Sequence, residues 1–159
     1  DHMPRGYVCV APASVWYTKQ WPAEKWVALI KQLPADRQVA LIGAPGDLAL
    51  CERIARDAGR GEVWAGKISL LATAVLMRDA TMNYVNDSAP LHIASAMNAP
   101  VTAIFCSTVP AFGFGPLGEN ARIMQMKEPL YCRPCGLHGY ASCPQGHFNC
   151  AKGIQLPVY

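Results

Sequence analysis

The chain has 159 residues, of which 52% are hydrophobic and 16% are charged, and its net charge is +3. This balance excludes a disordered chain and is typical of one globular domain with a packed core. The apolar runs are too short to cross a bilayer, and the basic residues do not gather as they do in nucleic-acid-binding proteins. We expect no secretory signal, because residues 1–3 do not form a basic leader, and the mild positive charge suits an anionic ligand.

Short runs typical of strands alternate with amphipathic helical stretches along the chain. In the first helical stretch, Pro22 occupies a favoured first-turn position and Pro34 ends the apolar periodicity. Gly59 ends the second stretch, and Ser69 is a favourable N-cap for the third. The pattern predicts strands at residues 7–10, 38–42, 63–64, 81–85, 101–105 and 121–126. It predicts helices at residues 22–33, 48–58, 70–75 and 90–97.

The spacing of these elements is typical of right-handed βαβ units around a parallel sheet. Residues 101–105 are apolar without strict alternation, as expected for a strand that is covered on both faces. The predicted fold class is therefore α/β, a doubly wound parallel sheet of the Rossmann-like kind. Because such sheets bind ligands at the carboxyl ends of their strands, we expect functional residues in the loops that follow the strands.

The loop after the first predicted strand carries Ser14 and Lys19, just ahead of a helix. A lysine there adds a full positive charge to the partial positive charge of the helix N-terminus, and this combination binds phosphate. The structural alternative is a solvated surface lysine.

The loop after residues 81–85 carries Asp87 and Ser88, and His92 lies on the first turn of the next predicted helix. An imidazole and free backbone N–H groups would meet an anion together in this place. Alternatively, Asp87 or Ser88 is only the N-cap of that helix, and His92 is a packed or capping histidine.

Several common nucleotide-site motifs are missing from the sequence. Gly43 and Gly46 are not followed by a third glycine at the spacing of a dinucleotide-binding fingerprint. The sequence also has no Walker A motif and no nucleophile elbow. These absences argue against a classical NAD domain, a P-loop NTPase and an α/β-hydrolase.

Three sequence blocks follow one another as TKQWP at residues 18–22, GKISL at 66–70 and NDSAPLHIA at 86–94. A Thr108-x-Pro110 block follows a later strand, and a cysteine-rich tail ends the chain. In this order they resemble the C-terminal domain of family 9 glycosyltransferases, the heptosyltransferases of lipopolysaccharide core synthesis. The resemblance covers nearly the whole chain.

The resemblance implies the GT-B architecture, in which two Rossmann-like domains face each other across a cleft and the C-terminal domain holds the nucleotide-sugar. Family members transfer a heptose from an ADP-sugar to a lipid-linked acceptor, with inversion and with no cofactor or metal required for transfer. The catalytic base belongs, in the family, to the N-terminal domain, so we expect no catalytic residue in this chain. We expect the donor-binding half of such an enzyme, inactive alone.

The resemblance also implies roles for single residues. Asp87 would accept hydrogen bonds from sugar hydroxyls, and Asp47, after the second predicted strand, would face the ribose. The residues expected at the diphosphate and its neighbouring groups are Ser14, Lys19, Ser88, Ala89 and His92. Ala89 and Cys106 stand where the family commonly has glycine, and the Ala89 methyl group would intrude on the donor site. The exact sugar therefore stays open.

The implied partners are an ADP-heptose-like nucleotide-sugar and a lipid-linked saccharide acceptor, which would be bound through the N-terminal domain. The implied location is the cytoplasm, at the inner face of the inner membrane, with peripheral membrane contact and no nucleic acid. Two alternatives remain: a glycosyltransferase domain for another nucleotide-sugar, and a non-catalytic binding domain stabilised by a metal.

Three of the seven cysteines, Cys9, Cys51 and Cys106, lie in apolar runs and are predicted to be buried thiols. The other four belong to a predicted tail, residues 130–159, which we expect to pack on a Rossmann-like domain of residues 1–129.

The four tail cysteines have the spacing of metal ligands, Cys132-x₂-Cys135-x₇-Cys143-x₆-Cys150. The opening Cys-x₂-Cys is typical of structural zinc and iron–sulfur sites, and His138 or His147 would be able to replace one cysteine. A structural metal, disulfides and free thiols all remain open, although disulfides are disfavoured in a cytoplasmic enzyme.

Overall fold

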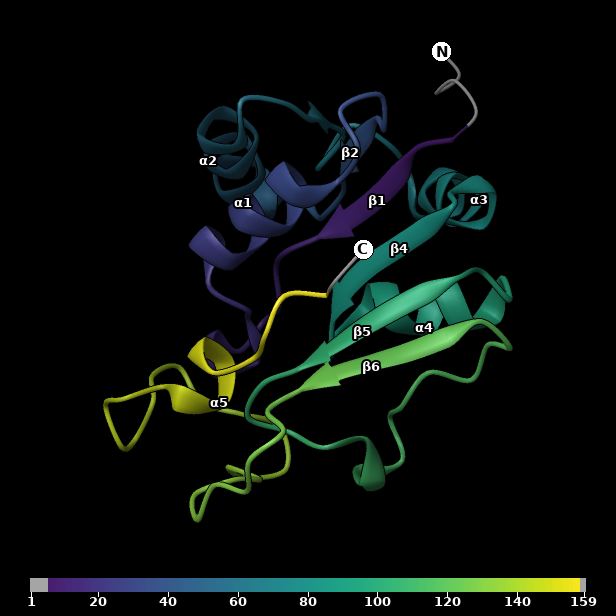
Figure 1. The fold of residues 1–159 in the computed structure, drawn as a ribbon. Coiled ribbons are helices and arrows are strands. Elements are labelled where there is room, and N and C mark those ends of the chain that lie inside the picture. The colour runs from purple at the N-terminus through teal and green to yellow at the C-terminus, as the bar shows by residue number, and fades with distance from the viewer. Residues whose placement is uncertain (1–5, 158–159) are drawn as a thin grey trace.

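Six parallel strands form one sheet in the computed structural model, which describes residues 6–157 (Figure 1). The strands lie in the order β3-β2-β1-β4-β5-β6. Their bounds are β1 Val8–Ala11, β2 Val39–Leu41, β3 Glu62–Val63, β4 Met82–Asn86, β5 Val101–Phe105 and β6 Ala121–Gln125. The prediction about a leader at residues 1–3 and the outer ends of the predicted segments 1–129 and 130–159 lie outside the described residues.

The strand order reverses between β1 and β4, which are neighbours at the centre of the sheet. The two strands pair in parallel, with Val10 opposite Tyr84 and Ala11 opposite Val85 at their carboxyl ends. Doubly wound sheets bind their ligands at such a reversal, because the loops that leave the two central strands diverge there. The loop after β1 and the loop after β4 therefore start side by side.

Helices cover both faces of the sheet (Figure 1). Helices α1 (Ala23–Gln32) and α2 (Leu48–Ala58) pack on one face, and α3 (Leu70–Asp79) and α4 (Ala89–Ala96) pack on the other. A short helix α5 (Asn149–Lys152) follows in the tail. Three 3₁₀ turns complete the elements, η1 (Tyr17–Lys19), η2 (Pro45–Asp47) and η3 (Pro110–Phe112).

The tail after β6 packs on the same face of the sheet as α1 and α2. Phe148, Ala151 and Ile154 are buried in the cluster that also holds Trp26 from α1 and Ile104 from β5. The hydrophobic burial of these side chains attaches the tail to the sheet beside the carboxyl ends of the strands.

The predicted fold class is confirmed, since all five strand pairings are parallel and helices lie on both faces. Ser69 caps α3 as predicted, with its hydroxyl accepting a hydrogen bond from the backbone N–H of Ala72 at 3.2 Å. Pro22 stands one residue earlier than predicted, at the N-cap of α1, and α3 extends to Asp79. The ends of the other five strands shift by at most one residue from the prediction, as hydrogen-bond-defined boundaries commonly do, and Val101–Phe105 has the predicted bounds.

The three apolar-run cysteines Cys9, Cys51 and Cys106 are fully buried, which confirms that prediction. Burial raises the pKa of the Cys9 thiol to about 12 and is also the largest cause that raises the pKa of Cys51 to about 12. These thiols are therefore protonated, inert parts of the core at neutral pH.

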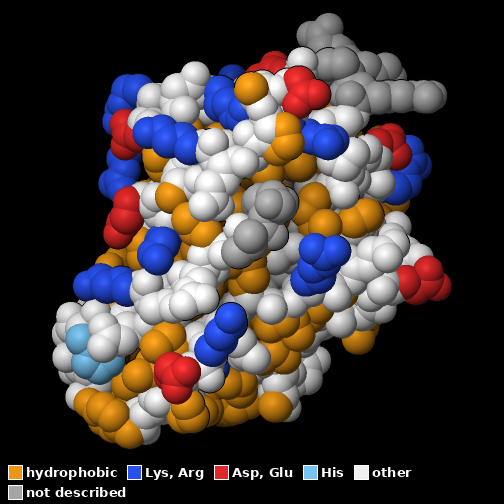
Figure 2. Space-filling view, viewed as in Figure 1, with side chains coloured by type: hydrophobic (Ala, Val, Ile, Leu, Met, Phe, Trp, Pro, Cys, Tyr) orange, Lys and Arg blue, Asp and Glu red, His pale blue; other side chains and the backbone are white. Residues whose placement is uncertain are grey.

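The surface agrees with the scattered charges of the sequence. On the face shown in Figure 2, Lys and Arg side chains are spread among acidic and neutral ones and do not form a stripe. Within residues 6–157, no helix is both long and apolar enough to span a membrane.

Candidate functional site

A pocket of about 480 Å³ lies over the carboxyl ends of the central strands. Its walls come from the loops after β1 and β2, from the segment that enters α3, and from the start of α4. The lining residues are Ala11, Ala13, Ser14, Val15, Ile42, Gly43, Ala44, Pro45, Asp47, Gly66, Ile68, Leu70, Thr73, Ser88, Ala89, Pro90 and Ile93. Most of these side chains are aliphatic, so the pocket suits an apolar or aromatic group with polar groups at its rim.

Four of the seven predicted ligand-contacting residues line this pocket: Ser14, Asp47, Ser88 and Ala89. The other three, Lys19, Asp87 and His92, do not line it. Asp87 nevertheless directly precedes the lining residue Ser88, and Lys19 lies beside Asp87. The structure therefore brings six of the seven together and leaves His92 apart.

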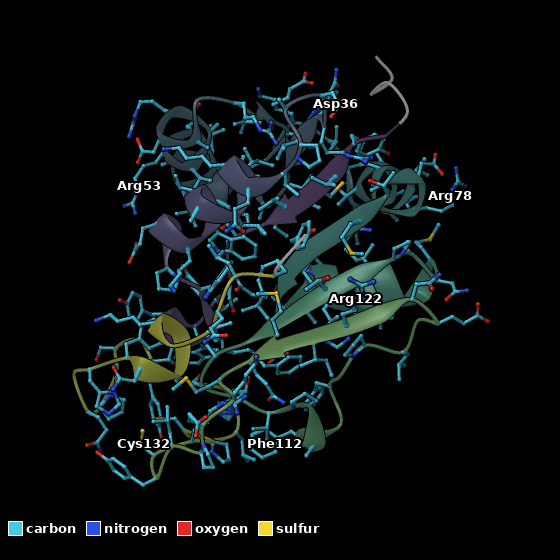
Figure 3. The ribbon with its side chains drawn as sticks, viewed as in Figure 1. Asp36, Arg53, Arg78, Phe112, Arg122 and Cys132 are labelled. Atoms are coloured by element: carbon cyan, nitrogen blue, oxygen red, sulfur yellow. The ribbon has the colours of Figure 1, made fainter. Side chains whose placement is uncertain are left out.

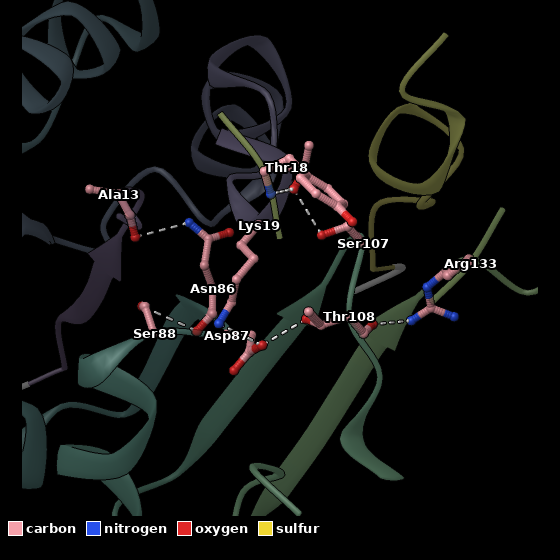
Figure 4. Close-up of polar contacts among 10 residues, drawn as sticks. Ala13, Thr18, Lys19, Asn86, Asp87, Ser88, Ser107, Thr108 and Arg133 are labelled. Carbon is pink, nitrogen blue, oxygen red and sulfur yellow. Dashed lines mark hydrogen bonds and ion pairs between the residues drawn. The ribbon is translucent and has the colours of Figure 1, made fainter. Parts of the chain in front are cut away.

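Lys19 and Asp87 form an ion pair at the edge of the pocket (Figure 4). The Lys19 Nζ atom lies 2.9 Å from Asp87 Oδ2, and the two side chains are 16% and 7% exposed. The Thr108 hydroxyl donates a hydrogen bond of 2.7 Å to the same Asp87 oxygen. Lys19 is therefore not a solvated surface lysine, and Asp87 is held from two sides.

The buried side chain of Asn86 ties the loop after β1 to the end of β4 (Figure 4). Its amide nitrogen donates to the carbonyl of Pro12 at 2.7 Å and to that of Ala13 at 3.3 Å. Its oxygen accepts from the backbone N–H of Trp21 at 3.0 Å. Both ends of the loop that carries Lys19 are thus fixed to the strand that carries Asp87.

The start of α4 faces the pocket with a serine at the N-cap position. The Ser88 hydroxyl donates to the carbonyl of Asn86 at 3.4 Å rather than accepting from an amide of the helix. The Asp87 carboxylate is likewise engaged with Lys19 and Thr108. Because the N-cap alternative does not describe these side chains, the first amides of α4 keep their positive potential for a ligand.

Asp47 lines the pocket, but one of its carboxylate oxygens is occupied. Asp47 Oδ2 accepts a hydrogen bond of 2.7 Å from the backbone N–H of Ala44, which closes the η2 turn. A Cβ atom at Gly43 would lie 2.8 Å from the same oxygen, so this turn requires a glycine. The other oxygen of Asp47 is available to a ligand.

His92 is exposed and lies outside the pocket. Its ring lies 6.4 Å from the ring of Phe114, in an edge-on arrangement. The exposed imidazole therefore lies beside Phe114, in the loop between β5 and β6, and away from the pocket.

The tail cysteines lie in the loop beyond β6, where Figure 3 labels Cys132, and at α5, and they are close enough to influence one another. Burial, followed by the nearby Cys143 and Cys132 thiols, raises the pKa of Cys150 to about 11. Burial and the same two neighbours raise the pKa of Cys135. Cys132 Sγ also lies 3.9 Å from Nε2 of His147. No group of three or more ligating side chains within residues 6–157 is already arranged around a metal position.

Sequence reasoning gave no role to three polar residues beside the ion pair: Thr18, Ser107 and Thr108. All three are buried. A usable signal was present, because Ser107 and Thr108 follow β5 at the same edge of the sheet as Asp87. Because β5 pairs with β4, polar residues directly after β5 are candidates to contact Asp87, which directly follows β4.

An open parallel sheet with a pocket over the carboxyl ends of its central strands defines a Rossmann-like ligand-binding domain. The chain belongs to glycosyltransferase family 9, because the family model described as "Glycosyltransferase family 9 (heptosyltransferase)" matches residues 1–138. This match confirms the resemblance found in the sequence blocks.

Single relatives agree with the family. Lipopolysaccharide heptosyltransferase 3 of Escherichia coli is 34% identical over 115 residues, which are 68% of this chain and 34% of that protein. The structure of E. coli heptosyltransferase WaaC with ADP has a TM-score of 0.68 and 26% identity, over 75% of this chain and 37% of that one. The iron-containing dodecameric glycosyltransferase TibC from enterotoxigenic E. coli H10407 has a TM-score of 0.65 and 20% identity, over 96% of this chain and 42% of that one. The chain thus spans about a third of the length of the curated relative that it matches.

Proposed function

We propose that this chain is the donor-binding part of a family 9 glycosyltransferase and that it binds an ADP-sugar with a heptose-like sugar. The observation that carries the proposal is the Lys19–Asp87 ion pair beside a pocket that is lined by Ser14, Ser88 and Ala89. A cation for phosphate, a carboxylate for sugar hydroxyls and a helix N-terminus then meet at one edge of the sheet.

The proposed placement of the donor follows the chemistry of the walls. The adenosine would fill the aliphatic part of the pocket, between side chains such as Ile42, Ile68 and Ile93. The free oxygen of Asp47 would accept from a ribose hydroxyl. The similarity to a heptosyltransferase that was solved with ADP supports this choice of nucleoside.

The diphosphate would lie between the start of α4 and Lys19. Backbone N–H groups at Ser88 and Ala89 and the Lys19 ammonium would share its negative charge. When the bond from the sugar to the diphosphate breaks, the charge on the leaving diphosphate rises, and these groups stabilise it. Asp87 would bind the sugar hydroxyls, and His92 would have to turn away from Phe114 to approach the phosphates.

Transfer would require the part of the protein that the relatives have in addition. The proposed lipid-linked acceptor and the proposed catalytic base belong to that part, and the action would take place at the inner face of the inner membrane. Asp87 is buried in its ion pair, which suits a binding role better than proton abstraction.

Isothermal titration calorimetry of the chain with ADP, UDP and GDP tests this proposal. We expect ADP to bind best, with a dissociation constant in the range of about 1 μM to about 1 mM. A preference for UDP or GDP would favour the alternative of another nucleotide-sugar. Absence of binding for all three would favour a non-catalytic binding domain.

We also propose that the four tail cysteines bind one structural iron or zinc ion. The pKa values of Cys135 and Cys150 support the idea, because Cys132 and Cys143 contribute to raising both and therefore lie near them. Neighbouring thiolates repel one another, and a bound cation would offset this repulsion and favour the thiolate forms. The fold is also similar to that of an iron-containing glycosyltransferase over 96% of this chain.

The thiols would have to move into ligand geometry, since none of the groups in residues 6–157 is arranged around a metal position. Elemental analysis of protein purified without a chelator tests this idea. We expect about one metal ion per chain, as for a four-cysteine site, and loss of that metal in Cys132→Ser. Cys51→Ser is the matched control. A metal-free chain whose thiols all react would contradict the proposal.

A further inference from the structure

The loop after β5 connects the two loops that form the candidate site (Figure 4). Thr108 donates to Asp87 at 2.7 Å, on the loop after β4. Ser107 donates from its hydroxyl to Thr18 Oγ1 at 3.1 Å and from its backbone N–H to the Thr18 carbonyl at 3.2 Å. Thr18 directly precedes Lys19, so residues 107–108 contact the surroundings of both members of the ion pair.

The tail in turn binds three consecutive carbonyls of this loop. The Arg133 guanidinium donates from Nε to the Cys106 carbonyl at 2.7 Å and from Nη2 to the Thr108 carbonyl at 2.8 Å. Between them, the Ser107 carbonyl accepts from the backbone N–H of Cys135 at 2.8 Å. The path of the loop after β5 is thus set by residues 133–135.

Arg133 has the right chemistry for this role. Arg133 also donates to the side-chain oxygen of Gln125, at the end of β6, at 2.8 Å. Its acceptors are thus backbone carbonyls and a side-chain amide oxygen, all of them neutral. Burial lowers its pKa from the ordinary value, but a guanidinium keeps its charge at neutral pH. Its planar fork reaches several carbonyls at once, which a lysine ammonium in the same place does less well.

The same part of the tail holds the Lys19 side of the site. The backbone N–H of Tyr140 donates to Thr18 Oγ1 at 2.8 Å, and the Thr18 N–H donates to the Tyr140 carbonyl at 3.1 Å. Gly139 approaches so closely, with φ of +85°, that an added Cβ would lie 2.9 Å from Thr18 Oγ1. Two residues of the tail therefore hold the site: Arg133 contacts the loop beside Asp87, and Tyr140 contacts the residue before Lys19.

We propose that Arg133 is a positioning residue of the donor site, which acts through Thr108, in the loop after β5, on Asp87. This inference rests on the proposed function, because Asp87 is assigned to donor binding only there. Arg133 fixes the Thr108 carbonyl, and the Thr108 hydroxyl then keeps Asp87 oriented for the sugar. The tail accordingly helps to hold the residues of the proposed binding site in place.

A double-mutant cycle in the whole chain tests this inference with ADP-heptose and ADP as probes. We expect Arg133→Lys and Thr108→Val each to weaken ADP-heptose binding about tenfold, with a smaller effect on ADP, because Asp87 meets the sugar. If Arg133 acts through Thr108, the double variant is also about tenfold weaker. A loss of about a hundredfold in the double variant, or equal losses for both ligands, would overturn the positioning role.

The matched control is Arg122→Lys, an exposed arginine on β6 that is labelled in Figure 3. We expect this variant to bind both ligands like the wild type. A loss of ADP-heptose binding equal to that of Arg133→Lys would overturn the inference.

Amide hydrogen exchange, measured by NMR without ligand, separates this inference from the proposed function. In Arg133→Lys, the amides of Ser107 and Cys135 should exchange faster, while the amide of Val85 in β4 should not change. Unchanged exchange at Ser107 and Cys135 would overturn the inference even if ADP-heptose binds. A wild type that binds neither probe would overturn the proposed function, while faster exchange would still support Arg133 as the residue that holds the loop.

Discussion

Lys19 and Asp87 face each other across the junction of β1 and β4, with the ammonium nitrogen 2.9 Å from the carboxylate oxygen. The sequence assigned these two residues to different parts of a ligand, and the structure joins them in one largely buried pair. A donor that binds phosphate at Lys19 and sugar at Asp87 must enter between or beside the two groups. Under the proposed function, the affinities for the two parts of the donor would therefore be coupled through this pair.

We expect Lys19→Ala to weaken ADP binding by about 1.5–3 kcal/mol, the range for hydrogen bonds to charged groups. The variant should also unfold more easily, because it leaves the Asp87 carboxylate buried without its cation. Calorimetric titration with ADP and thermal unfolding measure the two effects separately. Lys31→Ala removes an exposed lysine from α1 and is the matched control. A folded Lys19→Ala variant with wild-type affinity for ADP would contradict the phosphate assignment.

Asp87→Asn is expected to weaken binding of ADP-heptose more than binding of ADP. The amide retains an oxygen that accepts from Thr108 but loses the charge that attracts sugar hydroxyls and Lys19. The ratio of the two dissociation constants, compared with the wild-type ratio, is the measurement. An equal loss for both ligands would point to a structural role for the carboxylate, and Asp36→Asn, an exposed position, is the control.

Alkaline pH is expected to destabilise the chain through the buried thiols Cys9 and Cys51. In the folded chain the pKa of each is raised from 9.0 to about 12, mainly by burial. Both thiols ionise more easily in the unfolded chain, so this stabilisation is complete below about pH 9 and is lost as the pH rises toward about 12. Denaturant unfolding at several pH values between about 8 and about 11 measures the decline. Cys9→Ala should reduce its slope, and an unchanged slope would show that other groups cause it.

The chain alone is expected to bind ADP but to transfer no sugar, because under the proposed function the base and the acceptor site would lie in a part that the relatives have in addition. A radiochemical transfer assay with ADP-heptose and a lipid-linked acceptor, with and without the N-terminal part supplied separately, is the measurement. Activity of the isolated chain near that of the longer protein would place the base within these residues. Asp87 would then be the first carboxylate to test.

The fold was largely predictable from the sequence, because its signals are local. Val101–Phe105 has the bounds predicted for it, and the Ser69 cap and the Gly59 helix end lie where expected. The sequence also located four of the residues that line the pocket. The rule that ligands bind after strands indicated Ser14 and Ser88, and the family resemblance indicated Asp47 and Ala89.

The contacts between distant segments were not predictable in this way. Nothing in the residues around Arg133 indicates that its side chain reaches the carbonyl of Cys106, because that contact depends on how the tail folds back. The pairing of Lys19 with Asp87 is of the same kind, since it depends on the register between β1 and β4. Local patterns predict elements, whereas packing decides which side chains meet.

The place of β1 and β4 in the sheet has a consequence for local opening of the structure. Both strands are paired on two sides, whereas β3 has only two residues at one edge of the sheet and β6 forms the other edge. Edge strands open in small fluctuations that leave central strands closed, so that Lys19 and Asp87 are attached to the most persistent part of the fold. Gly66, which follows β3, lines the pocket. Fraying of β3 would therefore loosen this wall of the pocket first, while the Lys19–Asp87 ion pair stays intact.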